Sequence, residues 1–138
     1  MPWEMQYIAD KETLVVAPSG YLSDDDAREL TGQAIALLQE THATRVLSDC
    51  RGLESAPSVA ALYWLVQDYA NRGVPRHTRI ALVHSKAPQA VELAQFYETL
   101  CFNRRFQARV FQSKHAAEAW LGLTLTASST GPLLMPGK

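Results

Sequence analysis

The sequence predicts a single α/β domain in which a mixed β-sheet carries packed helices, with the element order β-β-α-β-α-β-α-β-α. Two extended segments near the N-terminus are followed by short apolar runs that alternate with longer segments of helical periodicity. This order is typical of a sheet covered by helices. The length of 138 residues suits one domain and is short for two.

Residues 5–22 are predicted to form a β-hairpin. Two extended segments meet at Asp10-Lys11-Glu12, and the second is rich in β-branched residues, which favour strands. The first helix is predicted to follow Ser23 as N-cap, with Asp26 three positions later as its capping-box partner. Apolar residues then recur at helical spacing as far as Leu38, so this helix has one face to bury.

The middle of the chain is predicted to run strand, helix, strand. The apolar run "TRVLSDC" precedes the clearest helical periodicity in the chain, at residues 59–70, which is predicted to stop at Asn71-Arg72-Gly73. The next segment, "RIALV", has four consecutive apolar residues. Such a run is typical of a strand covered on both faces, so its neighbours are expected to be parallel.

The last third is predicted to be helix, strand, helix. "SKAPQAVELAQFYETLCF" has Ser85 or Lys86 near its cap and Pro88 in its first turn. "FQARVF" is predicted to be the last strand, and "SKHAAEAWLGL" a short helix anchored by Trp120. One domain is therefore expected over residues 1–122. Residues 123–138 mix Thr, Ser, Gly and Pro without a period and are expected to form a flexible tail.

Composition argues against several classes of partner. The 13 basic and 14 acidic side chains leave a net charge of −1, so no overall field favours nucleic acid. Cys50 and Cys101 have neither CxxC nor Cys/His ligand spacing, so no metal or other cofactor is predicted. The apolar runs are shorter than the roughly 20 residues that span a bilayer, which predicts a cytoplasmic protein without stable membrane insertion.

The candidate site lies where the strands end. Right-handed crossovers bring the carboxyl ends of the third and fourth strands to one edge of the sheet, where open α/β sheets usually place their sites. The segment "LSDCRGLESAPS", residues 47–58, is predicted to lie on that edge, and His84 follows the neighbouring strand.

The order of elements also resembles a known family. With "SGYLSDDDARELTGQAIALLQE" leading into the first helix and "RVLSDCRGL" as the central strand, the chain resembles the STAS domain of anti-sigma factor antagonists. "RIALV" and "ARVFQSKHAAEAWL" are more similar to the SpoIIAA-like family of small bacterial proteins. The resemblance covers about residues 5–122. It implies a non-enzymatic regulatory module whose partner is a regulatory protein or a small apolar or lipid ligand.

The resemblance implies a candidate phosphosite. In STAS antagonists the central strand ends in Asp, passes a Gly and reaches an Asp-Ser-Ser-Gly turn, whose serine is phosphorylated by a partner kinase. Asp49, Gly52 and Ser58 match these positions. A phosphate on Ser58 would lie against the free N–H groups of a helix N-terminus and add negative charge to this edge.

The residues around this serine depart from the motif. Pro57 stands where the family has aspartate, and Val59 and Ala60 replace the second serine and the glycine. A structural role is the alternative, in which Ser58 or Ser55 simply caps the following helix.

A minor alternative is a small hydrolase or thiol enzyme that uses Asp49, Cys50, Ser58 and His84. The segment has no histidine of its own and no nucleophile elbow. Strand alternation places Asp49 and Arg51 on one side, as an ion pair, loop anchor or ligand contact, and Cys50 on the other. We expect Cys50 to be a buried hydrophobe and His84 to lie at the surface.

Aromatic and basic residues offer candidate binding surfaces. Tyr63 and Tyr97 fit buried helical stripes, whereas Trp64 lies off its stripe and is a candidate partner anchor or homodimer contact, or is covered by a loop or the tail. Arg104 and Arg105 belong, with Asn103 and Arg109, to the densest basic cluster, which is either a solvated rim or a site for the acid head group of a ligand. The candidate ligand- or partner-binding residues are Asp49, Arg51, Ser55, Trp64, His84, Arg104 and Arg105.

Overall fold

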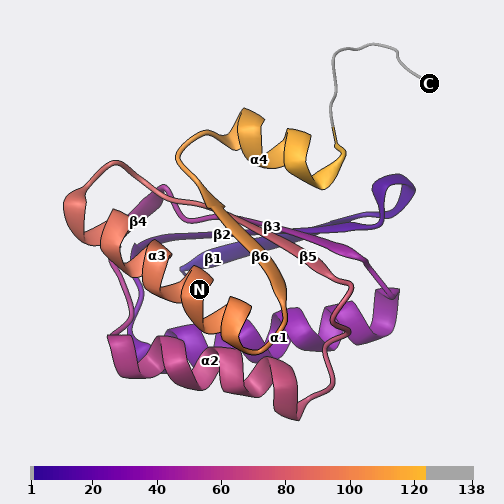
Figure 1. The fold of residues 1–138 in the computed structure, drawn as a ribbon, viewed down its shortest axis with the longest axis horizontal. Coiled ribbons are helices and arrows are strands. Elements are labelled where there is room, and N and C mark those ends of the chain that lie inside the picture. Colours follow the sequence, from indigo (N-terminus) through magenta and orange to yellow (C-terminus); the bar gives the residue numbers. More distant parts are fainter. Residues whose placement is uncertain (1, 124–138) are drawn as a thin grey trace.

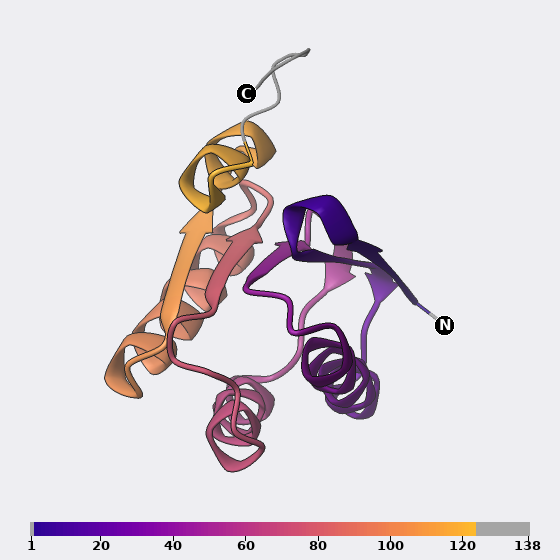
Figure 2. The ribbon, with the colours of Figure 1, turned by 90° about the vertical axis from the view of Figure 1, so that its right-hand side faces the viewer.

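The computed structural model describes residues 2–123, in which a six-stranded mixed sheet carries helices on both faces (Figures 1 and 2). The strands are β1 (Trp3–Ile8), β2 (Thr13–Tyr21), β3 (Arg45–Asp49), β4 (Gly52–Ser55), β5 (Arg79–Val83) and β6 (Gln107–Phe111). The helices are α1 (Asp24–Thr41), α2 (Val59–Asn71), α3 (Pro88–Asn103) and α4 (Lys114–Leu121), with a short 3-10 turn at Ala9–Lys11. The predicted fold class is confirmed.

The strand order is β1-β2-β3-β5-β6, with β4 beside the end of β2. Strands β1 and β2 form the predicted antiparallel hairpin, and every other pair is parallel. Glu12 turns the hairpin with φ 49°, and its carbonyl accepts hydrogen bonds from the backbone N–H groups of Thr44 and Arg45. The hairpin turn is thereby joined to the start of β3.

The predicted start of α1 is confirmed in detail. The Asp26 N–H donates to Ser23 Oγ at 3.0 Å, and the Ser23 N–H donates to Asp26 Oδ2 at 3.2 Å. Both halves of a capping box are therefore formed. At the start of α3, Pro88 lies in the first turn and Ser85 and Lys86 lie near the cap, as predicted; the N-cap itself is Ala87, which makes no side-chain cap hydrogen bond.

Alternation along the strands divides the core between the two faces of the sheet. Leu14, Val46 and Ile80 point toward α1, α2 and α3, whereas Leu47 and Val83 pack with α4 on the other face. Figure 2 shows α4 and the pair α1 and α2 on opposite sides of the strands. Helix α2 packs against α1 and α3 rather than on the sheet, so the three helices form an arch over one face.

The segment after β3 differs from the prediction of a simple strand-to-helix turn. The chain breaks at Cys50 and Arg51 and then forms β4, which continues beside β2 with Gly52 opposite Ser19. The Cys50 N–H still donates to the Val83 carbonyl at 2.8 Å. The carboxyl edge of β3 is therefore fixed to β5 before the chain turns toward α2.

The burial predictions for His84 and Tyr63 are wrong. His84 is only 7% exposed because it extends the alternation of β5 past its last residue, so that Ile80, Leu82 and His84 share the face beneath the helices. Tyr63 is 41% exposed because it lies at the outer rim of α2, where its ring contacts Trp64 edge to face at 5.3 Å between centroids. Tyr97, by contrast, is buried as predicted.

The predicted C-terminal tail lies outside the described residues except for its first member. Leu123 is 6% exposed and packs with the α4 side of the core. Among the described helices, none is long and apolar enough to cross a bilayer.

Candidate functional site

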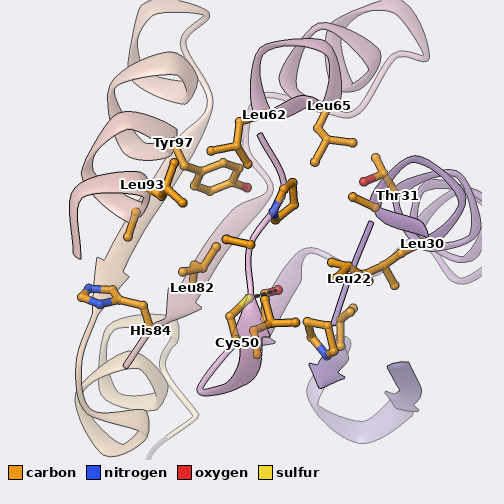
Figure 3. A pocket seen from close by; sticks show the side chains of 18 of the residues that line it. Leu22, Leu30, Thr31, Cys50, Leu62, Leu65, Leu82, His84, Leu93 and Tyr97 are labelled. Carbon is orange, nitrogen blue, oxygen red and sulfur yellow. Dashed lines mark hydrogen bonds between the residues drawn. The ribbon is translucent and has the colours of Figure 1, made fainter. Parts of the chain in front are cut away.

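A cavity of about 650 Å³ lies between the sheet and the helices α1, α2 and α3. Figure 3 shows Leu30, Leu62 and Leu93, one from each helix, around the same space. Volumes of this size are typical of small-molecule sites, which are mainly apolar with a few placed polar groups. Its apolar wall includes Val16, Leu22, Leu30, Ile35, Leu38, Val46, Leu53, Leu62, Leu65, Val74, Ile80, Leu82 and Leu93.

The cavity changes character along the strands. Its lining at the amino ends of β3 and β5 is apolar, with Val46 and Ile80. At the carboxyl ends the lining residues are Ser48, Cys50 and His84, followed by Ser85. The cavity is therefore amphipathic, and its polar end coincides with the predicted edge of the sheet.

The two tyrosines of the wall are paired. The hydroxyl oxygens of Tyr69 in α2 and Tyr97 in α3 lie 2.9 Å apart and share a hydrogen bond. Burial raises the pKa of both phenols above the usual range. The pair remains neutral and joins two of the helices that enclose the cavity.

Cys50 lines the polar end with a shielded thiol. Its Sγ lies 3.7 Å from Ser48 Oγ, the expected spacing for alternate residues that share a face. Burial raises the pKa of the Cys50 thiol to about 11. The sulfur is thus protonated at neutral pH, which suits a small hydrophobe better than a nucleophile, but the residue is half-buried rather than buried as predicted.

Thiol reactivity provides a direct check. Because burial raises the pKa of the Cys50 thiol from 9.0 to about 11, the thiolate fraction at neutral pH falls about a hundredfold, and reaction with a disulfide reagent should slow by about tenfold or more, since the higher nucleophilicity of the more basic thiolate offsets part of the loss. The pKa of Cys101, the other cysteine, rises to about 12 for the same reason. We expect the folded protein to react far more slowly than the chain in urea. A rate equal to that of free cysteine would contradict the burial of Cys50.

His84 is oriented by its neighbour. Its Nδ1 lies 2.8 Å from the Ser85 carbonyl oxygen, and a carbonyl can only accept, so Nδ1 carries a proton. In the neutral imidazole, Nε2 is then the acceptor. The ring thus offers the cavity end a hydrogen-bonding group.

Asp49 and Arg51 form an ion pair, one of the roles predicted for them. Arg51 Nε and Nη2 donate to the two carboxylate oxygens of Asp49 at 2.9 and 2.8 Å. Chiefly these hydrogen bonds hold the pKa of the Asp49 carboxyl below its usual value, and Lys114 of α4 adds a smaller Coulomb contribution. Neither residue lines the cavity, so the pair lies apart from it.

Ser58 caps α2 and binds the start of α1. Its Oγ accepts from the Ala61 N–H at 3.1 Å and donates to Asp24 Oδ2 at 2.8 Å, while the Ser58 N–H donates to Asp24 Oδ1 at 2.9 Å. These hydrogen bonds, the backbone one first, hold the pKa of the Asp24 carboxyl below its ordinary value. The serine that the family resemblance singled out therefore joins two helix N-termini.

Removing this cap should destabilise the fold measurably. Ser58→Ala is expected to lower the free energy of unfolding by about 1 kcal/mol, because the N–H of Ala61 loses its acceptor. Ser58→Thr keeps a hydroxyl and should retain most of that stability. Urea unfolding of both variants measures the difference, and equal stability of Ser58→Ala and the parent protein would argue against the cap.

The remaining predicted residues lie in different places. Ser55 lines the cavity, whereas Trp64 is 52% exposed. Arg104 donates to Gln67 Oε1 at 2.8 Å and its guanidinium lies 4.9 Å from the centre of the Tyr63 ring. Arg104 and the exposed Arg105 do not line the cavity. A ligand in the cavity therefore does not meet the two arginines that were predicted to bind its acid head group.

The residues of the catalytic alternative are not assembled. Within residues 2–123, no side-chain hydrogen bond joins any two of Asp49, Cys50, Ser58 and His84. The same described residues contain no group of three or more His, Cys, Asp or Glu side chains that could hold a metal ion.

Sequence reasoning did not single out six polar residues of the cavity, namely Thr31, Ser48, Glu54, Ser85, Gln89 and Glu92, although Ser48 and Glu54 lie within the predicted edge at residues 47–58. A signal existed for Ser48, because it lies two positions before Cys50 and so shares its face. No comparable signal exists for Gln89 and Glu92, since their position depends on how α3 packs over the strands.

Comparison with known proteins places the fold. A family model described as SpoIIAA-like matches residues 13–122, and no curated protein matches the chain. An uncharacterized protein of the DUF3478 family with a SpoIIAA-like fold, from Shewanella loihica PV-4, superposes with a TM-score of 0.58 at 18% identity, covering 86% of this chain and 91% of the other.

Two anti-sigma factor antagonists have similar structures. SpoIIAA in its unphosphorylated form gives a TM-score of 0.57 at 13% identity, covering 87% of this chain and 98% of the other. An anti-sigma factor antagonist from Mycobacterium paratuberculosis gives 0.60 at 16% identity, covering 87% and 94%. At these identities the likeness concerns the fold. The family match spans most of the chain, and the protein therefore belongs to the SpoIIAA-like family.

Proposed function

We propose that the protein is a non-enzymatic binding module that takes a small apolar ligand into the cavity between the sheet and the helices α1, α2 and α3. The observation that carries this function is the size of the cavity, about 650 Å³, together with its wall of leucine, valine and isoleucine. Apolar surface of this extent, gathered in one concave site, favours an apolar molecule over water. The protonated thiol of Cys50 fits a binding role better than nucleophilic chemistry.

Binding of an uncharged fluorescent dye tests the proposal. Nile red should bind saturably with one-to-one stoichiometry, because the structure offers one large apolar cavity among its described residues. Native mass spectrometry of the protein purified from its own cells should show a small apolar adduct that solvent extraction removes. Failure of Nile red to bind saturably to extracted, folded protein would overturn the proposal.

A regulatory protein partner is the second candidate, and exposed aromatic residues on α2 and α3 favour it. Tyr63, Trp64 and Phe102 are 41%, 52% and 77% exposed, and Arg104 connects the two helices beside Tyr63. Exposed tryptophan and tyrosine are common anchors of protein interfaces. Similar structures include anti-sigma factor antagonists, which are named for a protein that they oppose.

Photo-crosslinking tests this surface. A photoreactive residue at position 64 should capture one defined protein in cells, whereas the same residue at Lys86, which is exposed near the start of α3, should not. Identical products from both positions would argue against a specific surface on α2.

Phosphorylation of Ser58 would regulate this second function. The side chain is exposed at the N-terminus of α2, but its hydroxyl already donates to Asp24. A phosphate there would replace this hydrogen bond with repulsion between two anions, and would loosen the junction of α1 and α2. If Ser58→Asp leaves the crosslinked partner bound with unchanged affinity, this switch is ruled out.

A further inference from the structure

The described lining of the cavity contains carboxylates but no lysine or arginine. Among the described residues that line it, the only carboxylates are those of Glu54 in β4 and Glu92 in α3, and none is Lys or Arg. Both glutamates are exposed and therefore lie where the cavity meets solvent. A ligand that enters here meets no lysine or arginine side chain among the described lining residues.

The polar groups at the carboxyl edge can donate and accept hydrogen bonds. They are the hydroxyls of Ser48 and Ser85, the amide of Gln89 and the imidazole of His84. His84 donates from Nδ1 to the Ser85 carbonyl, which leaves Nε2 as the acceptor of the ring. These groups can satisfy one alcohol or amide, which both donates and accepts.

We propose that the cavity selects neutral amphiphiles, with an uncharged hydrogen-bonding head at the carboxyl edge of β3 and β5 and a hydrocarbon tail toward Val46, Val74 and Ile80. This inference rests on the proposed ligand-binding function and names its ligand class. A carboxylate head would leave water without a lysine or arginine of the described lining to pair with and would approach Glu54 and Glu92. An ammonium head gains little, because exposed carboxylates are screened by water and salt.

Competition with Nile red among three compounds of equal chain length tests the selection. Dodecanol should displace the dye at a concentration about tenfold or more below that of dodecanoate or dodecylammonium, with dodecanol kept below its solubility limit and the two ionic compounds below their micelle-forming concentrations. Dodecanoate or dodecylammonium that competes as well as dodecanol would overturn the selection. Because Nile red binding itself reports the cavity, that result would leave the proposed function standing.

A charge reversal at the mouth locates the head group. Glu92→Lys should improve competition by dodecanoate about three- to tenfold and leave dodecanol nearly unchanged, because only the carboxylate gains a partner. Glu40→Lys makes the same change of net charge on an exposed part of α1 that does not line the cavity. Equal improvement in both variants would show an effect of overall charge and overturn the placement of the head at this edge.

Discussion

Leu121→Ala should lower the free energy of unfolding by about 2–5 kcal/mol, the usual range for a leucine truncated in a core. Leu121 is 1% exposed and packs with Leu47, Ala81 and Val83, where α4 covers one face of the sheet. The helix has only eight residues, so it depends on this packing rather than on its own hydrogen bonds. Urea unfolding followed by circular dichroism measures the loss.

Phe102→Ala is the matched control for this truncation. It removes a larger apolar side chain from the end of α3, but that side chain is 77% exposed, so the change should stay within about 0.5 kcal/mol. A loss for Leu121→Ala no greater than that for Phe102→Ala would contradict the packing of α4 on the sheet. The cavity lies on the opposite face, so folded Leu121→Ala should still bind Nile red.

Ala34→Phe should abolish saturable Nile red binding, with at least about a tenfold loss of affinity. Ala34 lies on the inner face of α1 and lines the cavity, so a phenyl ring at this position occupies space that the ligand needs. The same substitution at Ala36, which is exposed two residues later on α1, should leave binding unchanged, because that side chain points away from the cavity.

Stability measurements on Ala34→Phe and Ala36→Phe distinguish a loss of binding from a loss of folding. A ring added to a tightly packed core costs about 1–3 kcal/mol, whereas at Ala34 it enters existing space, so Ala34→Phe should unfold at nearly the urea concentration of the parent protein. A folded Ala34→Phe that binds Nile red as well as Ala36→Phe would place the dye outside the cavity. It would then remove the main support for a ligand-binding function.

Local signals predicted most of the fold. The capping box of Ser23 and Asp26 needs only residues three positions apart, and the strand of β5 needs only its own apolar run, so both could be found without tertiary information. Strand β4 could not be predicted from its own sequence, because the segment has weak strand propensity. It becomes a strand by pairing with the end of β2. The ion pair of Asp49 and Arg51 followed from strand alternation and formed as one of the predicted options.

The cavity depends on distant packing and was only implied by family resemblance. Its wall combines three helices with four strands, and no periodicity within one segment indicates that α2 packs on α1 and α3 instead of on the strands. The burial of His84 was within reach, because extending the alternation of Ile80 and Leu82 by one step places it on the covered face. The position of the Arg104 side chain could not be predicted in this way, because its partner Gln67 is 37 residues away in the chain.

The strands that form the floor of the cavity and the helix α2 that forms its roof are held in place by different kinds of contact. The floor is made of strands that share ladder hydrogen bonds. The side-chain hydrogen bonds that hold the roof include those from Ser58 to Asp24, from Gln39 to the Arg72 carbonyl, from Arg104 to Gln67, and between the hydroxyls of Tyr69 and Tyr97. A displacement of α2 breaks these contacts and leaves every strand pair intact. The position of this one helix therefore determines the volume of the cavity.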